Sequence, residues 1–304
     1  MAELVAVLDL GSNAARFLLA RVKPGVGFRV LKKERVQTRL GWGPAGTLPR
    51  EAVTATLDAV HDFLHRVRNG RDPRVLAVAT AAVRDAGNRD TLLGPLRRHE
   101  GVRVRILSGP EEARLAALAA IHSLPVSEGL VADLGGGSLQ LTRLREGRIG
   151  ATACVPLGAV RTTRRFLRHD PPTPRELRAL RREVHERLLG ALPLGHRGDD
   201  LIGLGGTVRE LASIHLRAHP GARFRHGLHL RQSDVTAIRE RLEALPVKKR
   251  RRIPGLKSER ADIILAGAIV IEELITLGGY LTLTICTHGV RDGLLLRETF
   301  DGAL

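Results

Sequence analysis

Aromatic side chains are scarce in this chain, which has six phenylalanines, one tryptophan and one tyrosine among 304 residues. Proteins that bind single-stranded nucleic acid stack its bases on aromatic rings, so this scarcity argues against such a role, and no nucleic-acid recognition motif appears. Cysteine is also rare. Cys154 and Cys286 lie in separate apolar strand patterns with neither disulfide nor metal-ligand spacing, which predicts two buried, reduced thiols.

Long apolar runs are missing as well. The most apolar segment after the N-terminal strands, residues 263–271, is far shorter than the ~20 residues needed to cross a bilayer. Residues 1–4 lack the basic side chains that begin a signal peptide and fit the start of a strand. We therefore expect a cytoplasmic protein that does not associate with membranes.

Lysine is rare in a strongly basic chain. The net charge is +17, which favours polyanionic partners. Only six of the 49 basic residues are lysine, and the arginines are spread along the whole sequence. Genomic base composition can produce the same bias, so the charge supports an anionic ligand only together with the motifs below.

The stretch Leu130–Leu141 joins two strand patterns through a glycine-rich turn. An apolar strand reaches Asp133, the turn Gly135–Ser138 follows, and alternation then resumes with leucines on one face and Gln140 and Thr142 on the other. Glycines have no Cβ, so their backbone N–H groups can approach an anion closely. Ligands of open α/β sheets bind at the carboxyl ends of strands, where Asp133 lies. We interpret this stretch as a phosphate-binding hairpin with a carboxylate suited to a metal ion.

The same order of residues occurs near the N-terminus, where an apolar strand is followed by Asp9, Leu10 and the turn Gly11-Ser12-Asn13. A third turn, Gly203–Thr207, also follows an apolar strand and leads into a helical pattern. Two related hairpins, one in each half, predict a duplicated α/β fold with a cleft between two domains. This arrangement resembles the actin, hexokinase and heat-shock-protein-70 superfamily, which has a ribonuclease H-like fold. We place the boundary at residue 125, giving domains 1–125 and 126–304 with the last helix able to pack on the first domain.

Residues 108–121 predict a helix that separates the roles of two adjacent glutamates. Ser108 and Glu111 have the spacing of a capping box, and Pro110 suits the first turn of a helix. Glu111 therefore has a structural role at the helix terminus. Glu112 points in another direction around the helix and is the better candidate for chemistry.

Four motifs occur in a characteristic order: Asp9–Asn13, Thr80–Asn88, Ser108–Leu115 and Asp133–Ser138. Together they resemble the exopolyphosphatase and guanosine pentaphosphate phosphohydrolase family over nearly the whole chain. Two of the three asparagines of the chain, Asn13 and Asn88, fall inside these motifs. The length resembles the short, two-domain form of the family.

The resemblance implies a role for each motif. Glu112 matches the catalytic glutamate that orients and deprotonates water, and the hydrolysis of a terminal phosphoryl group depends on positioning and charge neutralisation. Asp9, Asp133 and Gln140 match positions that hold Mg²⁺ or Mn²⁺. The implied phosphate-binding residues are Gly11, Ser12, Asn13, Arg84, Gly135, Gly136, Gly137, Ser138, Gly205, Gly206 and Thr207. The implied partners are inorganic polyphosphate, guanosine penta- or tetraphosphate, and a second copy of the chain in a homodimer.

Three departures from the family pattern bear on activity. Gln140 replaces a usual glutamate, which keeps an oxygen ligand but removes its charge. Ala14 replaces a usual serine or threonine, and Asp292 replaces a usual glutamate near the C-terminus. A polyphosphate- or alarmone-binding protein that has lost turnover therefore stays an alternative to a phosphohydrolase. A kinase of the same superfamily is a further alternative, which Ser108–Leu115 disfavours.

Two arginine- and lysine-rich segments, Arg161–Arg168 and Lys248–Arg252, could form a track for a polyanion. We expect the second of them to be a solvated loop.

Overall fold

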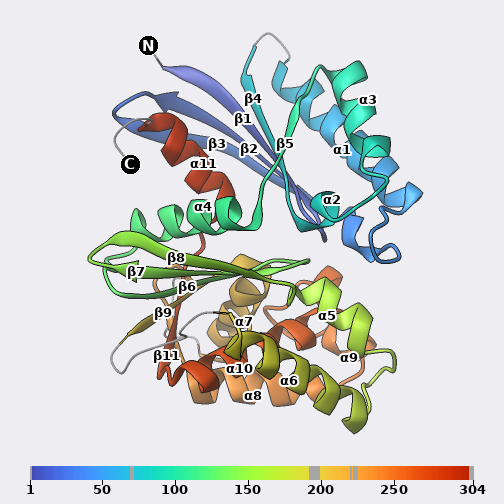
Figure 1. Cartoon of the computed structure of the whole chain (residues 1–304), viewed down its shortest axis with the longest axis vertical. Coiled ribbons are helices and arrows are strands. Elements are labelled where there is room, and N and C mark those ends of the chain that lie inside the picture. The colour runs from blue at the N-terminus through green and yellow to red at the C-terminus, as the bar shows by residue number, and fades with distance from the viewer. Residues whose placement is uncertain (1, 69–71, 192–198, 220, 222–224, 301–304) are drawn as a thin grey trace. The chain divides into compact units, whose positions relative to one another are not determined.

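A computed structural model of the chain describes residues 2–68, 72–191, 199–219, 221 and 225–300 (Figure 1). The chain forms two compact units, of which unit 1 comprises Met1–Leu115 and Val290–Leu304, and unit 2 comprises Ala116–Gly289. The boundary falls inside the helix α4 (Gly109–Ile121), earlier than the predicted position at residue 125. The C-terminal helix α11 (Val290–Thr299) belongs to unit 1.

Unit 1 contains a mixed five-stranded sheet. Its strands, in sheet order, are β3 (Gly27–Val36), β2 (Ala15–Lys23), β1 (Glu3–Leu10), β4 (Arg74–Ala79) and β5 (Val104–Ile106). The first three strands of the chain pair antiparallel as consecutive hairpins, whereas β4 and β5 run parallel to β1. The carboxyl ends of β1, β4 and β5 therefore lie at one edge of the sheet.

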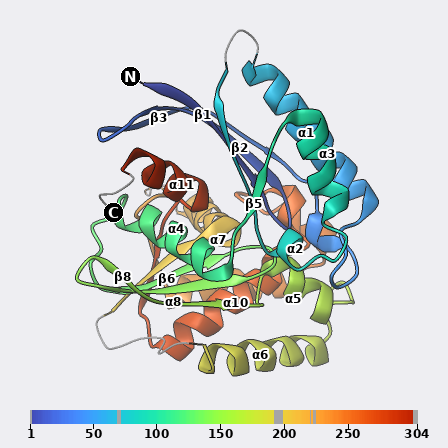
Figure 2. The ribbon, with the colours of Figure 1, turned by 45° about the horizontal axis from the view of Figure 1, so that its top comes forward.

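Helices cover both faces of this sheet (Figures 1 and 2). The helices α1 (Arg50–Arg68) and α3 (Asp90–Glu100) lie on one face, and α11 packs on β1, β2 and β3 from the other. Alternating residues of β1, Ala6, Leu8 and Leu10, enter the core under α1, where Phe17 and Phe63 stack with ring centroids 4.9 Å apart. Because helices cover both faces of the sheet, residues 5–10 of β1 are all buried, which explains the continuous apolar run at residues 5–8.

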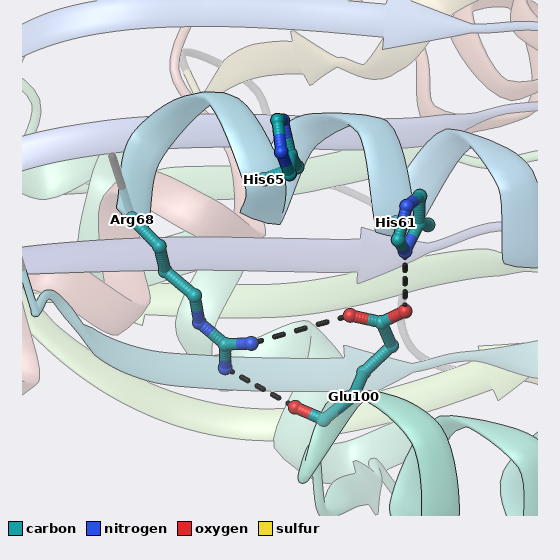
Figure 3. A pocket seen from close by; sticks show the side chains of 4 residues that line it. All are labelled: His61, His65, Arg68 and Glu100. Carbon is teal, nitrogen blue, oxygen red and sulfur yellow. Dashed lines mark hydrogen bonds and ion pairs between the residues drawn. The ribbon is translucent and has the colours of Figure 1, made fainter.

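A hollow of about 390 Å³ lies where α1 meets the end of α3 and is lined by His61, His65, Arg68 and Glu100 (Figure 3). His61 Nδ1 lies 2.8 Å from Glu100 Oε1, and the hydrogen bond to this carboxylate raises the pKa of the exposed His61. Arg68 Nη2 donates to the Glu100 carbonyl at 3.2 Å. Because α1 ends just before β4 begins, the hollow lies at the amino edge of the parallel strands, opposite to the edge where such sheets bind ligands.

Unit 2 contains a mixed six-stranded sheet. Its strands, in sheet order, are β10 (His229–Arg231), β11 (Thr282–Ile285), β9 (Asp200–Leu204), β6 (Gly129–Leu134), β7 (Leu139–Arg145) and β8 (Arg148–Val155). The central strands β11, β9 and β6 are parallel, and the remaining strands pair antiparallel. The helices are α5 (Ala159–Phe166), α6 (Pro174–Leu189), α7 (Gly205–Ala218), α8 (Gln232–Glu243), α9 (Val247–Arg250) and α10 (Ile264–Gly278).

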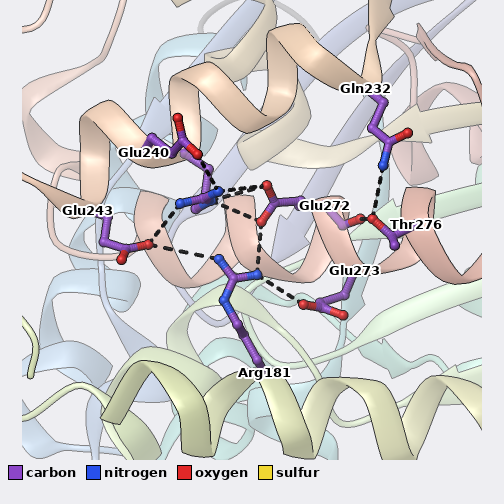
Figure 4. A network of polar contacts seen from close by, with 8 residues as sticks. Arg181, Gln232, Glu240, Glu243, Glu272, Glu273 and Thr276 are labelled. Atoms are coloured by element: carbon purple, nitrogen blue, oxygen red, sulfur yellow. Dashed lines mark hydrogen bonds and ion pairs between the residues drawn. The ribbon is translucent and has the colours of Figure 1, made fainter. Parts of the chain in front are cut away.

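The helix α10 is the centre of helix packing in unit 2. It contacts α5, α6, α7 and α8, and its apolar residues are almost all buried. One charged residue of this helix, Glu272, is also buried, and it accepts hydrogen bonds from Arg239 Nε and Arg181 Nη1, both at 3.0 Å (Figure 4). Burial opposes ionisation of Glu272, but the hydrogen bonds from Arg239 and Arg181 outweigh it and lower its pKa. This carboxylate thus joins α10 to α8 and α6.

Two expectations from the sequence need correction. Cys154 is exposed, because it lies on β8 at the edge of the sheet, whereas Cys286 is buried as predicted. The basic segment 248–252 is only partly the expected solvated loop: its first residues form α9 and Arg250 is 2% exposed, whereas the other four side chains are exposed. Arg250 Nε donates to the Leu242 carbonyl at 2.6 Å, and burial lowers its pKa. This arginine is part of the packing of unit 2 and cannot line a track for a polyanion.

Among the helices of the described residues, none has the length and apolar composition needed to cross a membrane.

Candidate functional site

Three sequence motifs converge at the carboxyl edge of the parallel strands in unit 1. Asp9 pairs with Val78, and Ala79 pairs with Ile106, so the ends of β1, β4 and β5 are level with one another. The segments that follow these ends contain residues 11–13, 80–84 and 107–112. Open α/β sheets bind their ligands at this edge because loops and helix N-termini there present unpaired backbone donors. The fold thus places Asp9–Asn13, Arg84 and Glu112 at the same edge of the unit 1 sheet.

The loop after β1 packs against a short helix, η1 (Leu40–Trp42). The Gly41 N–H donates to the Ser12 carbonyl at 2.7 Å, and a Cβ at position 41 would lie 2.8 Å from Ser12 Cβ. Asn13 is 5% exposed and accepts a hydrogen bond from Trp42 Nε1 at 3.4 Å. Its Nδ2 is buried and has no hydrogen-bond partner among the described residues. A buried amide donor of this kind is a group that an anion can satisfy.

Asp9, a predicted metal ligand, is paired with an arginine in the structure. Its Oδ2 accepts from Arg16 Nη1 at 3.2 Å, and the residue is 5% exposed. Arg291 of α11 is partly buried and donates to the Phe17 carbonyl at 3.1 Å. Burial lowers the pKa of Arg291, and the charge of Asp9 opposes that shift. Arg16 already supplies the positive charge that a metal ion would bring, so Asp9 fits the role of direct metal ligand less well than the residues of unit 2.

The predicted base and the predicted phosphate-binding arginine are in contact. Glu112 lies in the first turns of α4 and is 6% exposed. Arg84, the last residue of the short helix α2 (Ala81–Arg84), places Nη1 3.5 Å from Glu112 Oε2 and donates from the same nitrogen to the Leu107 carbonyl at 2.9 Å. A planar guanidinium suits bidentate contact with a phosphoryl group. This pair can therefore hold a phosphoryl group next to a carboxylate able to take a proton.

Glu111 forms the predicted cap of α4. Its Oε2 accepts from both the backbone N–H and the hydroxyl of Ser108 at 2.8 Å, and its own N–H donates to Ser108 Oγ at 3.3 Å. These bonds from Ser108, with a further ion pair to Arg105, lower the pKa of Glu111 to about 2. The structure thus gives the two adjacent glutamates separate environments.

In unit 2 the predicted hairpin forms between β6 and β7, with Asp133 directly opposite Gln140 in the register. Directly opposed residues share one face of a sheet, so both side chains lie on the same side of the hairpin. Gln140 is 1% exposed, and its Nε2 donates to Ser138 Oγ at 2.6 Å. Its Oε1 has no hydrogen-bond partner among the described residues. A carboxylate beside an unsatisfied carbonyl oxygen is a donor set that suits Mg²⁺.

The glycine turn Gly135–Ser138 rests on the start of α5. The Ala159 N–H donates to the Gly135 carbonyl at 3.0 Å, and Arg161 Nε donates to the Gly137 carbonyl at 2.8 Å. A Cβ at Gly158 would lie 2.3 Å from Gly137 C and Ser138 N. Hydrogen bonds to its carbonyl groups thus hold the turn against the start of α5. Motif reasoning missed Gly158, although its place in a Gly-Ala-Val-Arg helix start is a local signal.

The third turn joins the same site in unit 2. Gly205 has a φ of 96°, and a Cβ there would lie 2.9 Å from Asp133 Oδ1 and 2.3 Å from the Leu134 carbonyl oxygen. Only glycine fits this position, where α7 begins beside the Asp133 carboxylate. Arg260, 6% exposed, lies over Gly206 and donates to Thr207 Oγ1 at 3.5 Å. Both this guanidinium and the helix N-terminus favour an anion. No local pattern distinguishes Arg260 from the other arginines, so the sequence could not reveal it.

A sequence model described as the Ppx/GppA phosphatase family matches residues 18–300 of this chain. The chain belongs to this family. It is 32% identical to exopolyphosphatase 2 of Mycobacterium tuberculosis over 96% of this chain and 97% of that protein.

Solved structures of the family have the same fold. The structure of the Aquifex aeolicus member of the Ppx/GppA family aligns over 98% of both chains with a TM-score of 0.81 and 26% identity. An exopolyphosphatase from Cytophaga hutchinsonii aligns over 99% of both chains with a TM-score of 0.90 and 24% identity, which shows a shared fold. The α/β architecture of two units with mixed sheets is thus the one predicted from the paired hairpins.

Proposed function

We propose that this protein is a metal-dependent exopolyphosphatase, which removes the terminal phosphate of inorganic polyphosphate by hydrolysis. The observation that carries the proposal is the contact between Arg84 and Glu112 at the ligand-binding edge of unit 1. The choice of substrate is supported by two comparisons: the chain belongs to a phosphatase family, and it is similar to a mycobacterial protein named as an exopolyphosphatase.

In this mechanism Glu112 orients a water molecule and accepts its proton as the oxygen attacks the terminal phosphorus. The bridging P–O bond breaks, orthophosphate leaves, and the shortened chain keeps the electron pair on its new terminal oxygen. Arg84 binds equatorial oxygens of the phosphoryl group and offsets the charge that builds up on them. Correct placement of water and phosphoryl group is the main contribution expected of such a site.

The proposed phosphate donors are backbone N–H groups of the loops Gly11–Asn13, Gly135–Ser138 and Gly205–Thr207. In the first two loops the glycine at the start closes the turn, because the Gly11 and Gly135 N–H groups donate to the Ala14 and Ser138 carbonyls. Asp133 and Gln140 are the proposed ligands of Mg²⁺ or Mn²⁺, which when bound neutralises phosphate charge. Asp9 acts in this proposal through Arg16, whose position it holds.

The test is phosphate release from long-chain polyphosphate by the purified chain with Mg²⁺ or Mn²⁺, with Arg84→Gln beside the wild type. We expect turnover by the wild type and a strong loss in the variant, with Arg89→Gln as a control for general loss of positive charge. Binding of polyphosphate by the wild type without any phosphate release would refute hydrolysis and favour the binding-protein alternative, for which Gln140 is the specific reason.

Three further parts of the proposal need their own measurements. Guanosine pentaphosphate is the proposed second substrate, and its conversion to tetraphosphate in the same assay would test it. A homodimer is the proposed assembly, which sedimentation analysis tests. A cytoplasmic location is the proposed setting, which fractionation of cells tests.

A further inference from the structure

Three side chains of unit 2 that have no part in the proposed hydrolysis gather beyond the end of β11. They are Cys286, His288 and His226, and their ligand atoms, one from each residue, all lie within 4.8 Å of one another. Cys286 is buried, whereas the two histidines are partly exposed. The histidine rings meet edge to face with centroids 4.8 Å apart.

Backbone hydrogen bonds hold two of these residues in place. Cys286 directly follows β11, and its N–H donates to the Gly203 carbonyl at 2.9 Å, which fixes it beside β9. His226 precedes β10, and the next residue, Gly227, donates to the Ile285 carbonyl at 2.8 Å. Backbone hydrogen bonds alone therefore hold together two segments that are far apart in sequence.

The surroundings of His226 resemble those of a metal-binding histidine. Its Nε2 lies 2.8 Å from the Ser123 carbonyl oxygen, which can only accept a hydrogen bond, so the proton is on Nε2. Nδ1 therefore carries the lone pair, and at present it accepts from the Thr287 N–H at 3.2 Å. A histidine that binds a metal through one nitrogen usually donates from the other to a carbonyl or carboxylate, which orients the ring and raises its basicity.

One thiolate and two imidazoles form a borderline-soft ligand set that suits Zn²⁺. Zn–S and Zn–N bonds of about 2.3 and 2.0 Å place tetrahedral ligand atoms roughly 3.5 Å apart. The three ligand atoms therefore need to approach by about 1 Å, which side-chain rotation of the partly exposed histidines can supply. The cluster as described contains no carboxylate, so it differs in chemistry from the pair Asp133 and Gln140.

We propose that Cys286, His226 and His288 bind one Zn²⁺ ion, with a water molecule as the fourth ligand. The ion joins the segment after β11 to the segment before β10. It also restrains residues 286–288, which precede Gly289, the last residue of unit 2 before the chain returns to unit 1 at Val290. The site is a structural clasp, and it does not depend on the proposed phosphatase activity.

The experiment uses the full chain, stripped of metal with a chelator and titrated with Zn²⁺ against a chromogenic competitor. Wild type is compared with Cys286→Ser, His226→Gln and His288→Gln. The matched control is Cys154→Ser, which removes the other thiol of the chain. Replacement of Zn²⁺ by Co²⁺ reports the ligand type, because a Co²⁺–thiolate bond gives a charge-transfer band in the near ultraviolet.

We expect one Zn²⁺ per wild-type chain, a higher melting temperature with Zn²⁺, and at least about tenfold weaker binding in each cluster variant. Cys154→Ser should bind as the wild type does. Equal binding by Cys286→Ser and wild type, absence of the thiolate band, or equal weakening by Cys154→Ser would overturn the proposal. Should Cys286→Ser fail to fold, His288→Gln decides the matter, since that side chain is partly exposed.

Discussion

Glu111 and Glu112 are adjacent glutamates for which the structure predicts opposite effects of the same substitution. Glu111 accepts two hydrogen bonds from Ser108 at the start of α4, whereas Glu112 contacts Arg84. Glu111→Ala should lower stability and spare catalysis. Glu112→Ala should lose catalysis even under conditions where the variant is fully folded.

The cost of losing the Glu111 cap follows from its pKa. A decrease from 4.5 to about 2 corresponds to roughly 3 kcal/mol if it were fully expressed as stability. The side chain is 35% exposed, so solvent screening reduces this figure, and measured capping interactions are worth about 1 kcal/mol. We therefore expect Glu111→Ala to lower the free energy of unfolding of unit 1 by about 1 kcal/mol.

The sign of the pH dependence can also be predicted. Because the folded-state pKa of Glu111 lies below its unfolded value, the stabilisation is fully present above about pH 4.5 and is lost as pH falls toward 2. The difference in urea midpoint between wild type and Glu111→Ala should thus shrink as pH decreases through this window. A difference that stayed constant with pH would contradict the role of the carboxylate.

The catalytic half of the comparison is a phosphate-release assay with long-chain polyphosphate. General base catalysis contributes roughly 10²–10⁴-fold, so Glu112→Ala should lose at least about 100-fold in kcat. Glu111→Ala should retain most of the wild-type rate at a temperature where it is folded. Equal loss in both variants, or a rate in Glu112→Ala within tenfold of wild type, would refute the assignment of the base.

Three other substitutions test separate parts of the structure. Gln140→Glu adds a charged oxygen opposite Asp133 and should lower the Mg²⁺ concentration needed for half-maximal phosphate release. If that Mg²⁺ concentration is unchanged or higher, Gln140 is not a metal ligand. Gly158→Ala places a methyl group against the backbone of the glycine turn and should reduce kcat/KM about 100-fold. The control is Gly190→Ala at the end of α6, where a Cβ meets no close atom, and it should have little effect on kcat/KM. Glu272→Ala removes the buried carboxylate that two partly buried arginines share and should cost about 3 kcal/mol in urea unfolding. The exposed Glu240→Ala in the same network should cost less than about 0.5 kcal/mol, and equal costs would disprove the role of burial.

Local pattern in the sequence was sufficient for much of the fold. The alternation around Gln140 predicted the hairpin of β6 and β7, and the spacing of Ser108 and Glu111 predicted the start of α4 and the cap that the structure shows. Such features depend on residues close together in the chain, where backbone geometry alone relates the side chains. The glycine turns and the family followed from the same kind of local order.

Tertiary structure decided what depends on residues distant in sequence. Arg250 lies in a basic run yet is buried, and Cys154 lies in an apolar strand yet is exposed, because burial depends on what packs against a segment. The same holds for Arg260 over the third turn and for His226 beside Cys286. The sequence by itself determined the elements, the turns and the chemistry available in each motif. Only the folded chain determined which of these groups meet, since contacts between distant residues depend on the packing of whole strands and helices.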